Sequence, residues 1–175
     1  KESELRKLDK EIAERKKQII WMDDEILVQE FGLYKPQFDF ASALDYKEAL
    51  LEIRAKQKQL IKDKKAVSGD TQWQVNGSAA KGKKMVSDTQ KLLLRAFNVE
   101  CDELVSKVKY TNFDSYLERI YKSAEAISKL GAVMNISITQ HYLSSKVKEL
   151  RLAFEYQTKK QQEKDLLEDH KGIKN

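Results

Sequence analysis

The sequence KLLLRAFNVECDELVSKV, residues 91–108, is the segment on which the predicted fold depends most. Its apolar residues recur at helical spacing on two sides of one helix. One side holds Leu92, Ala96 and Val99, and the other holds Leu93, Phe97, Cys101, Leu104 and Val108. A helix that is apolar on more than one face is typical of the centre of a bundle. We therefore expect this helix to be the most buried one in the domain.

Capping and breaking signals predict where this helix and its neighbours begin and end. Residues 87–90 (Ser-Asp-Thr-Gln) have the pattern of a capping box, so the central helix should begin there and run to about Lys109. The other helices are predicted over about 46–65, with Ser42 or Asp45 as the cap, and over 113–130, with Gly131 at the end. The last helix is predicted from Thr139 onward, with Thr139 as its cap. One Pro and six Gly leave few helix breakers, which favours helices over a strand-rich sandwich.

A short hairpin is predicted near residues 71–84. Asn76-Gly77 is the strongest short turn signal, and polar and apolar residues alternate before it. A two-residue loop would pair Trp73 with Ala80, and the Trp73 face should pack on the helices. The predicted fold is therefore mainly α, a helical domain with one small β-hairpin and a long N-terminal helix that resembles a coiled coil.

The first 30 residues are predicted to form this charged helix, which has a heptad repeat. The seam residues of the repeat are Leu5, Leu8, Ile12, Ile19, Met22 and Ile26. Such spacing favours a coiled coil, formed either with a second copy of the chain or with another helix of the same chain. Gly32 and Pro36 should end the helix.

An aromatic segment follows the N-terminal helix. Its large apolar residues are Phe31, Leu33, Tyr34, Phe38 and Phe40. Such an irregular segment is expected to wrap a core, and a ligand groove is the alternative. At the other end of the chain, the apolar stripe of the last helix stops after Phe154. The predicted domains are a stalk or oligomerisation helix at 1–30, a globular domain at 31–156, and a projecting charged helix or linker at 157–175.

Composition excludes several classes of protein. The chain has 33 basic and 28 acidic residues and a net charge of +5, a mild basic bias that is weak evidence for nucleic-acid binding. Cys101 is the only cysteine, so no internal disulfide can form, and a reducing compartment is expected. One Cys and two His argue against a zinc site, and no cofactor is predicted. No apolar run is long enough to span a membrane, so membrane association would need a segment outside these residues.

A candidate polar or anion site lies on the central helix. Arg95, Asn98 and Asp102 are three and then four residues apart, so they share one face. An arginine in such a group can bind a phosphate or an acidic ligand. The alternative is a polar network that fixes how the helix docks, because buried polar groups need partners.

A candidate nucleic-acid patch consists of two lysine groups that flank the predicted hairpin. They are Lys62, Lys64 and Lys65 before it, and Lys81, Lys83 and Lys84 after it. A formed hairpin would bring the groups together, and a dense positive patch can contact a phosphate backbone. The alternative is an ordinary solvated surface. No Gly-rich phosphate loop and no nucleophile motif appears, so the chain is not predicted to be an enzyme.

Four segments carry a family resemblance, together with the helix around Phe154. They are 29–34 (QEFGLY), 73–78 (WQVNGS), 93–102 (LLRAFNVECD) and 107–110 (KVKY). They resemble a bacterial and phage family catalogued as Domain of Unknown Function 4041, over about residues 26–160. The resemblance implies a domain that precedes a GIY-YIG nuclease domain of the phage T5 type, in proteins linked to phage genomes and to bacterial defence against phage. The chain lacks the Gly-Ile-Tyr and Tyr-Ile-Gly pair, so no catalytic residue is carried over.

With this resemblance, the predicted function is that of a non-catalytic interaction and positioning module of a larger GIY-YIG nuclease. Its partner would be a phage or host protein, on the cytoplasmic side of a bacterial cell, and the nuclease would follow Asn175. A homo-oligomer through the N-terminal helix is a further expected interaction. The alternative function is a domain that binds DNA directly and holds it for the nuclease. The sequence identifies neither the ligand nor the stimulus.

Overall fold

The computed structural model describes residues 1–15 and 36–173, and its regular structure is mainly helical, as predicted. The chain divides into two units, Lys1–Gln37 and Phe38–Asn175. In the first unit, residues 2–15 form a helix. The second unit contains the helical bundle that is described below.

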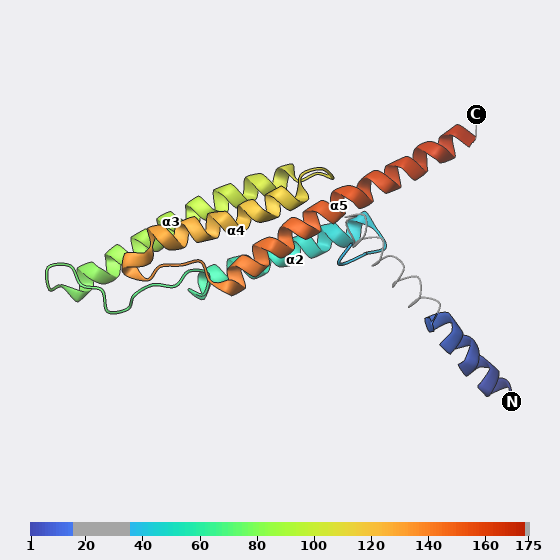
Figure 1. Cartoon of the computed structure of the whole chain (residues 1–175), viewed down its shortest axis with the longest axis horizontal. Coiled ribbons are helices and arrows are strands. Elements are labelled where there is room, and N and C mark those ends of the chain that lie inside the picture. Colours follow the sequence, from blue (N-terminus) through green and yellow to red (C-terminus); the bar gives the residue numbers. More distant parts are fainter. Residues whose placement is uncertain (16–35, 174–175) are drawn as a thin grey trace. The chain divides into compact units, whose positions relative to one another are not determined.

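The helices of the second unit are α2 (Ala43–Lys62), α3 (Ala79–Lys107), α4 (Phe113–Leu130), the short 3₁₀ helix η1 (Ala132–Met134) and α5 (Gln140–Ile173). In Figure 1, α3 lies beside α4, and α2 lies beside α5. Side-chain contacts join the start of α2 to Glu155 and its later turns to Ser145, so α2 and α5 are antiparallel. Asn98 and Asp102 of α3 contact Tyr142 and Lys146 of α5 in the same order along the chain, so α3 is parallel to α5 and antiparallel to α2.

The most buried helix is α5, and the prediction that α3 would be so is wrong. Buried residues cover most of the circumference of α5 between Tyr142 and Glu155. On α3 the face with Phe97 and Cys101 is fully buried, as predicted. The second apolar face of α3 is exposed, because the other described helices pack only against the first. Charged residues interrupt the apolar pattern of α5, so the hydrophobic periodicity of its sequence did not predict how deeply this helix is buried.

The predicted hairpin is also wrong, although its turn is present. The amide of Val75 donates to the carbonyl of Ser78 at 3.1 Å, the reverse bond is 2.9 Å, and Asn76 and Gly77 have φ of +51° and +79°. No strand occurs in the described part of the chain. The reason is that Ser78 is the N-cap of α3, with its Oγ accepting from the Lys81 amide at 3.2 Å. The helix therefore begins at Ala79, well before the predicted capping box.

The connection before α3 packs closely on that helix through a glycine. A Cβ placed on Gly82 would lie 1.8 Å from the carbonyl oxygen of Trp73. Any larger residue would therefore push the connection away from α3. Further along, Gln90 donates to the carbonyl of Ser68 at 2.9 Å, and Val67 forms an isolated bridge with Ile138. These contacts fix the long connection between α2 and α3 against the start of α5.

Three predicted helix boundaries are confirmed. Ser42 caps α2 by accepting from the Asp45 amide at 3.3 Å. Gly131 follows the end of α4, and a Cβ there would lie 2.5 Å from the Ile136 carbonyl oxygen. Thr139 precedes α5, and its Oγ1 accepts from the Tyr142 amide at 3.3 Å. Each of these signals is local, which explains why the sequence predicted them correctly.

Candidate functional site

A polar network crosses the bundle between α2, α3 and α5. Lys146 is at its centre, with its Nζ 3.3 Å from Asp102 Oδ1 and 3.4 Å from Glu149 Oε1. The side chains of Lys146 and Glu149 are only 4% and 3% exposed. Burying a charge is costly unless it is paired and hydrogen-bonded, and here each charge has a partner. The network therefore specifies how the three helices fit together.

Glu149 extends the network to α2. Its Oε1 accepts from Gln57 Nε2 at 3.1 Å, and its Oε2 accepts from Arg54 Nε at 3.0 Å. Gln57 is itself buried and also donates to the carbonyl of Ser145 at 3.3 Å. Both oxygens of one carboxylate on α5 are thus used by two side chains of α2.

The ionisable groups around this network have shifted pKa values. Burial lowers the pKa of the Lys146 ammonium, but Glu149 and the smaller effects of Tyr142 and Asp102 outweigh it, so the pKa is raised. Burial raises the pKa of Tyr142. Burial also raises the pKa of the Cys101 thiol to about 12. At neutral pH Lys146 is therefore a cation and Cys101 is a neutral, buried thiol, which is not the state of a reactive cysteine.

The structure separates the three residues of the candidate polar or anion site. Asn98 accepts a hydrogen bond from the Tyr142 hydroxyl at 2.5 Å, and Asp102 pairs with Lys146. These two residues join α3 to α5, which corresponds to the polar-network alternative. Arg95 is exposed, and its side chain forms no ion pair or hydrogen bond with the described residues. An anion site at Arg95 stays a prediction.

Two glutamates of α5 hold the beginning of α2 and the segment before it. Glu155 is 3% exposed, and its Oε1 accepts from the amides of Phe38 and Asp39, at 3.1 and 3.4 Å, and from the Tyr46 hydroxyl at 3.1 Å. Glu163, two turns further along α5, accepts from the Ala43 amide at 3.0 Å. A carboxylate near the first turn of α2 also stabilises that helix, because it interacts with the positive end of the helix dipole. We call Glu155 and Glu163 the glutamate clamp.

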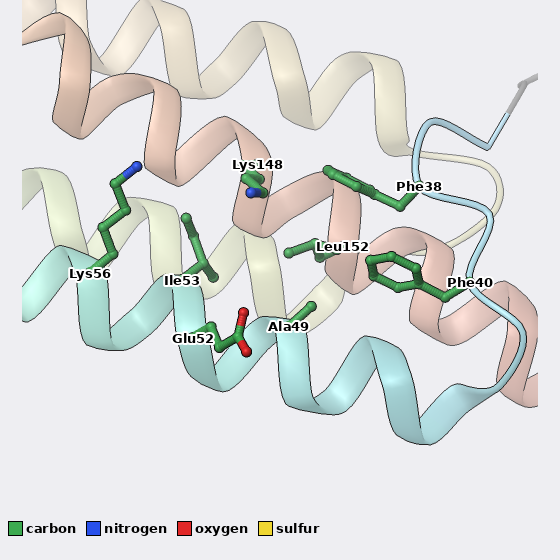
Figure 2. Close-up of a pocket in the computed structure, with 8 residues that line it drawn as sticks. All are labelled: Phe38, Phe40, Ala49, Glu52, Ile53, Lys56, Lys148 and Leu152. Atoms are coloured by element: carbon green, nitrogen blue, oxygen red, sulfur yellow. The ribbon is translucent and has the colours of Figure 1, made fainter.

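A pocket of about 210 Å³ lies beside this clamp, between α2, α5 and the segment before α2. Figure 2 shows its lining. The lining residues are Phe38 and Phe40 from the segment, Ala49, Glu52, Ile53 and Lys56 from α2, and Lys148 and Leu152 from α5. Two aromatic residues of the predicted aromatic segment therefore both pack on the bundle and line a groove. Residues 31–35 of that segment lie outside the described residues.

The lysines of the candidate nucleic-acid patch are all exposed. Lys62 ends α2 and Lys64 and Lys65 follow it, whereas the second group lies in the first two turns of α3. The hairpin that was expected to bring the groups together does not form, and no described hydrogen bond or ion pair joins them. Trp73, between the groups, is half-buried. Phosphate binding by these lysines stays a prediction.

The candidate oligomer seam is described only in part. Leu5, Leu8 and Ile12 lie in the helix of residues 2–15 and are 62%, 53% and 51% exposed. Ile19, Met22 and Ile26 lie outside the described residues. Self-association through this seam also stays a prediction.

The described residues form neither a metal-binding cluster nor a membrane-spanning helix. Residues 1–15 and 36–173 contain no group of three or more His, Cys, Asp or Glu side chains that could hold a metal ion. None of the helices in these ranges combines the length and apolar character needed to cross a membrane.

The sequence did not reveal the residues that organise this region, which are Arg54, Gln57, Lys146, Glu149, Glu155 and Glu163. The available signal was charge within an apolar stripe, since Lys146 lies three residues after Leu143 and four before Leu150. On a buried helix such a charge must find a partner. The partners come from helices that are distant in sequence, so spacing along the chain did not identify them.

Comparison with known proteins identifies the family. The description of the matching family is SNIPE associated domain, and the match covers residues 43–161, more than half of the chain. No curated protein and no solved structure matches the chain. The match corrects the resemblance to the Domain of Unknown Function 4041 family, because SNIPE is a distinct family. The family is linked to nuclease-associated proteins, which is compatible with an accessory role. The chain belongs to the SNIPE associated domain family.

Proposed function

We propose that the chain is a non-catalytic module that positions a GIY-YIG nuclease and binds a phage or host protein in bacterial defence against phage. The family match supports an accessory role. The observation that carries the proposal is the glutamate clamp. Through it, the start of α2 and the segment before α2 are held against α5 on either side of the point where α5 leaves the bundle.

The clamp gives the bundle a geometry suited to positioning. The segment before α2 and the later turns of α5 meet at one end of the bundle, because the two helices are antiparallel. Beyond Tyr156, α5 continues as a largely exposed helix, with Leu166 and Leu167 being 68% and 63% exposed. A partner that binds at this end would contact both segments at once. The buried network around Glu149 would keep α2 and α5 in a fixed register when the partner binds.

The experiment uses the full-length nuclease protein in which this chain occurs, expressed in cells that are challenged with phage. The Glu155→Gln, Glu163→Gln double variant removes the charge of both clamp residues. We expect plaque numbers to rise towards those of unprotected cells, while cleavage of DNA by the purified protein stays unchanged. Glu168→Gln is the matched control, because Glu168 is an exposed glutamate further along α5.

Two outcomes would contradict this function. Equal loss of DNA cleavage and of protection would make the bundle part of the catalytic machinery. Full protection by the double variant, folded and expressed at the normal level, would show that the clamp has no part in positioning.

The N-terminal helix has a separate role in this proposal, which is self-association of the full-length protein. Its described seam residues are exposed and lie at heptad spacing. Replacement of Leu5, Leu8 and Ile12 by Ser should lower the mass measured by light scattering to that of a monomer. A protein that is monomeric before the replacement would exclude self-association.

DNA binding is the second candidate function, and one observation favours it. Lys81, Lys83 and Lys84 lie in the first two turns of α3, whose first turn has no acidic residue. The N-terminus of a helix carries a partial positive charge, so lysine side chains near it repel this charge. A bound phosphate group would be attracted both to the lysines and to the helix N-terminus. This candidate predicts binding of duplex DNA whose logarithmic salt dependence has a slope of about −0.9 for each phosphate contact.

Replacement of the three lysines by Glu tests this candidate in a gel-shift titration. The DNA affinity and the salt slope should both fall, whereas Lys122→Glu on α4, at an i,i+4 ion pair with Glu118, should change neither. No shift of duplex or single-stranded DNA by the unmodified chain at low salt would exclude DNA binding.

A further inference from the structure

The pocket between α2 and α5 is large enough for one apolar side chain. Its volume is about 210 Å³. An apolar cavity of about 150 Å³ takes up a benzene molecule, so a phenyl ring or a branched aliphatic group fits here. The walls are the rings of Phe38 and Phe40, and the floor is formed by Ile53 and Leu152 (Figure 2).

Two lysines at the rim give the pocket a preference for negative charge. Lys56 projects from α2 and Lys148 from α5, and Glu52 is the single carboxylate among the lining residues. Neither lysine forms an ion pair with a described residue, in contrast to Lys146 nearby. The Nζ of Lys148 instead lies 5.7 Å from the centre of the Phe38 ring. A carboxylate that enters beside the ring would therefore meet an ammonium group already in place.

The aromatic wall is held in position before anything binds. The Phe38 amide donates to Glu155, and the Phe40 amide donates to the Tyr46 hydroxyl at 3.1 Å. The rings of Phe40 and Tyr46 are 4.8 Å apart between centroids. A fixed wall lowers the entropy lost on binding, which is the usual advantage of a preorganised site.

We infer that this pocket anchors a segment of the partner protein in which one large apolar side chain lies next to an Asp or Glu. The apolar side chain fills the space between Phe38, Phe40 and Leu152, and the carboxylate pairs with Lys148 and Lys56. The inference rests on the proposed function, in that it assigns to the protein partner a place on the bundle. A buried apolar anchor with charged groups at its edge is a common form of interface hot spot.

Short peptides titrated into the ¹⁵N-labelled chain of residues 1–175 test the inference by NMR. The probe is acetyl-Gly-Phe-Glu-Gly-amide, and the comparison peptides carry Lys in place of Glu, or Ala in place of Phe. We expect amide shifts centred on Ala49, Ile53 and Leu152, and a Kd for the probe about threefold or more below that of the lysine peptide. The preference should weaken at high salt.

Three variants make the test specific. Lys148→Gln should remove most of the preference for the acidic peptide, and Ala49→Phe should abolish binding because it fills the pocket. Lys160→Gln is the matched control, since Lys160 also lies over an aromatic ring, that of Tyr156, at 5.9 Å, but does not line the pocket. Circular dichroism checks that Ala49→Phe folds, and Lys148→Gln changes only an exposed residue.

Shifts that lie away from the pocket, or equal binding of the acidic and lysine peptides, would overturn the inference. Absence of binding would overturn it as well. These failures are distinguishable from failure of the proposed function. If plaque numbers respond to the clamp variant but peptides do not bind, the partner contacts another surface. If peptides bind but plaque numbers do not respond, the pocket is real and the positioning role is wrong.

Discussion

Helices α5 and α3 differ in what they bury. Helix α5 buries the charged residues Lys146, Glu149 and Glu155, whereas α3 exposes the apolar residues Leu92 and Val99, which are 67% and 69% exposed. The position of a helix between its neighbours therefore decides burial in this bundle, more than its hydropathy does. Charges are tolerated inside because residues from other helices pair with them. The outer apolar face of α3 has no such neighbour among the described residues.

The largest expected effect comes from breaking the buried charge network. Glu149→Ala leaves Lys146 buried and removes the acceptor of both Arg54 and Gln57. We expect the free energy of unfolding to fall by about 3–5 kcal/mol, as for other buried ion pairs that lose one partner. Urea unfolding followed by circular dichroism measures this value.

The double variant Lys146→Met, Glu149→Leu is the control for this prediction. It removes both charges and keeps a similar volume, so its stability should exceed that of Glu149→Ala. A double variant that is less stable than the single variant would show that the network contributes more than the avoidance of an unpaired charge.

Alkaline pH should destabilise the bundle through Cys101. The pKa of this thiol is raised from 9.0 to about 12, so between these values the unfolded chain has released its proton and the folded chain has kept it. Stability contributed by the neutral thiol is therefore complete below pH 9 and is lost between pH 9 and 12, with a slope approaching about 1.4 kcal/mol per pH unit.

The measurement is urea unfolding at pH 8, 9 and 10, compared with the Cys101→Ala variant. Tyr46 and Lys146 have unfolded pKa values of 10.0 and 10.5, so their contributions are lost mainly at higher pH. The variant should show a shallower decline in this window. An identical decline in both proteins would mean that the thiol is not protected in the folded state.

A moderate effect is expected at the close contact between Gly82 and Trp73. Gly82→Ala places a methyl group where the Trp73 carbonyl lies, and overpacking of this kind costs about 1–3 kcal/mol. Gly172→Ala is the opposite case, because no atom lies within 4 Å of its new Cβ, and it should stabilise α5 by less than about 1 kcal/mol. Thermal unfolding that moves in the same direction for both variants would contradict this prediction.

The smallest effect is expected on the outer face of α3. Leu92→Ala should change stability by less than about 0.5 kcal/mol, because the side chain is exposed. The adjacent Leu93→Ala should cost about 2–5 kcal/mol, because Leu93 is buried. Similar losses for the two variants would mean that a further surface covers Leu92 in solution.

The parts of the fold that the sequence predicts are those set by local signals. Ser42, Gly131 and Thr139 mark helix boundaries through residues within a few positions of themselves. Asn76-Gly77 likewise specifies a turn, but only over two residues. Ser78 both closes that turn and caps α3, and the helix formers Ala79 and Ala80 after it favour a helix over the second strand of a hairpin.

The candidate site was less predictable, because its contacts join distant positions. Glu149 pairs with residues of α2 that are 92 and 95 positions away, and Asp102 pairs with a residue 44 positions away. Helical spacing identified Asn98 and Asp102 as neighbours on one face, and both do contact α5. It did not identify Lys146 as their partner, because Lys146 lies on a different helix, 44 positions from Asp102.

The two polar contacts between α3 and α5 also restrict how the bundle can move. Asn98 contacts Tyr142 and Asp102 contacts Lys146, so the donors and the acceptors are each one helical turn apart. If α3 slid along α5 by one turn, Asp102 would meet Tyr142 and Lys146 would lose that carboxylate. Because such a shift would take a carboxylate partner from the buried Lys146, we expect α3 and α5 to resist sliding and to move together as one rigid unit when a partner binds.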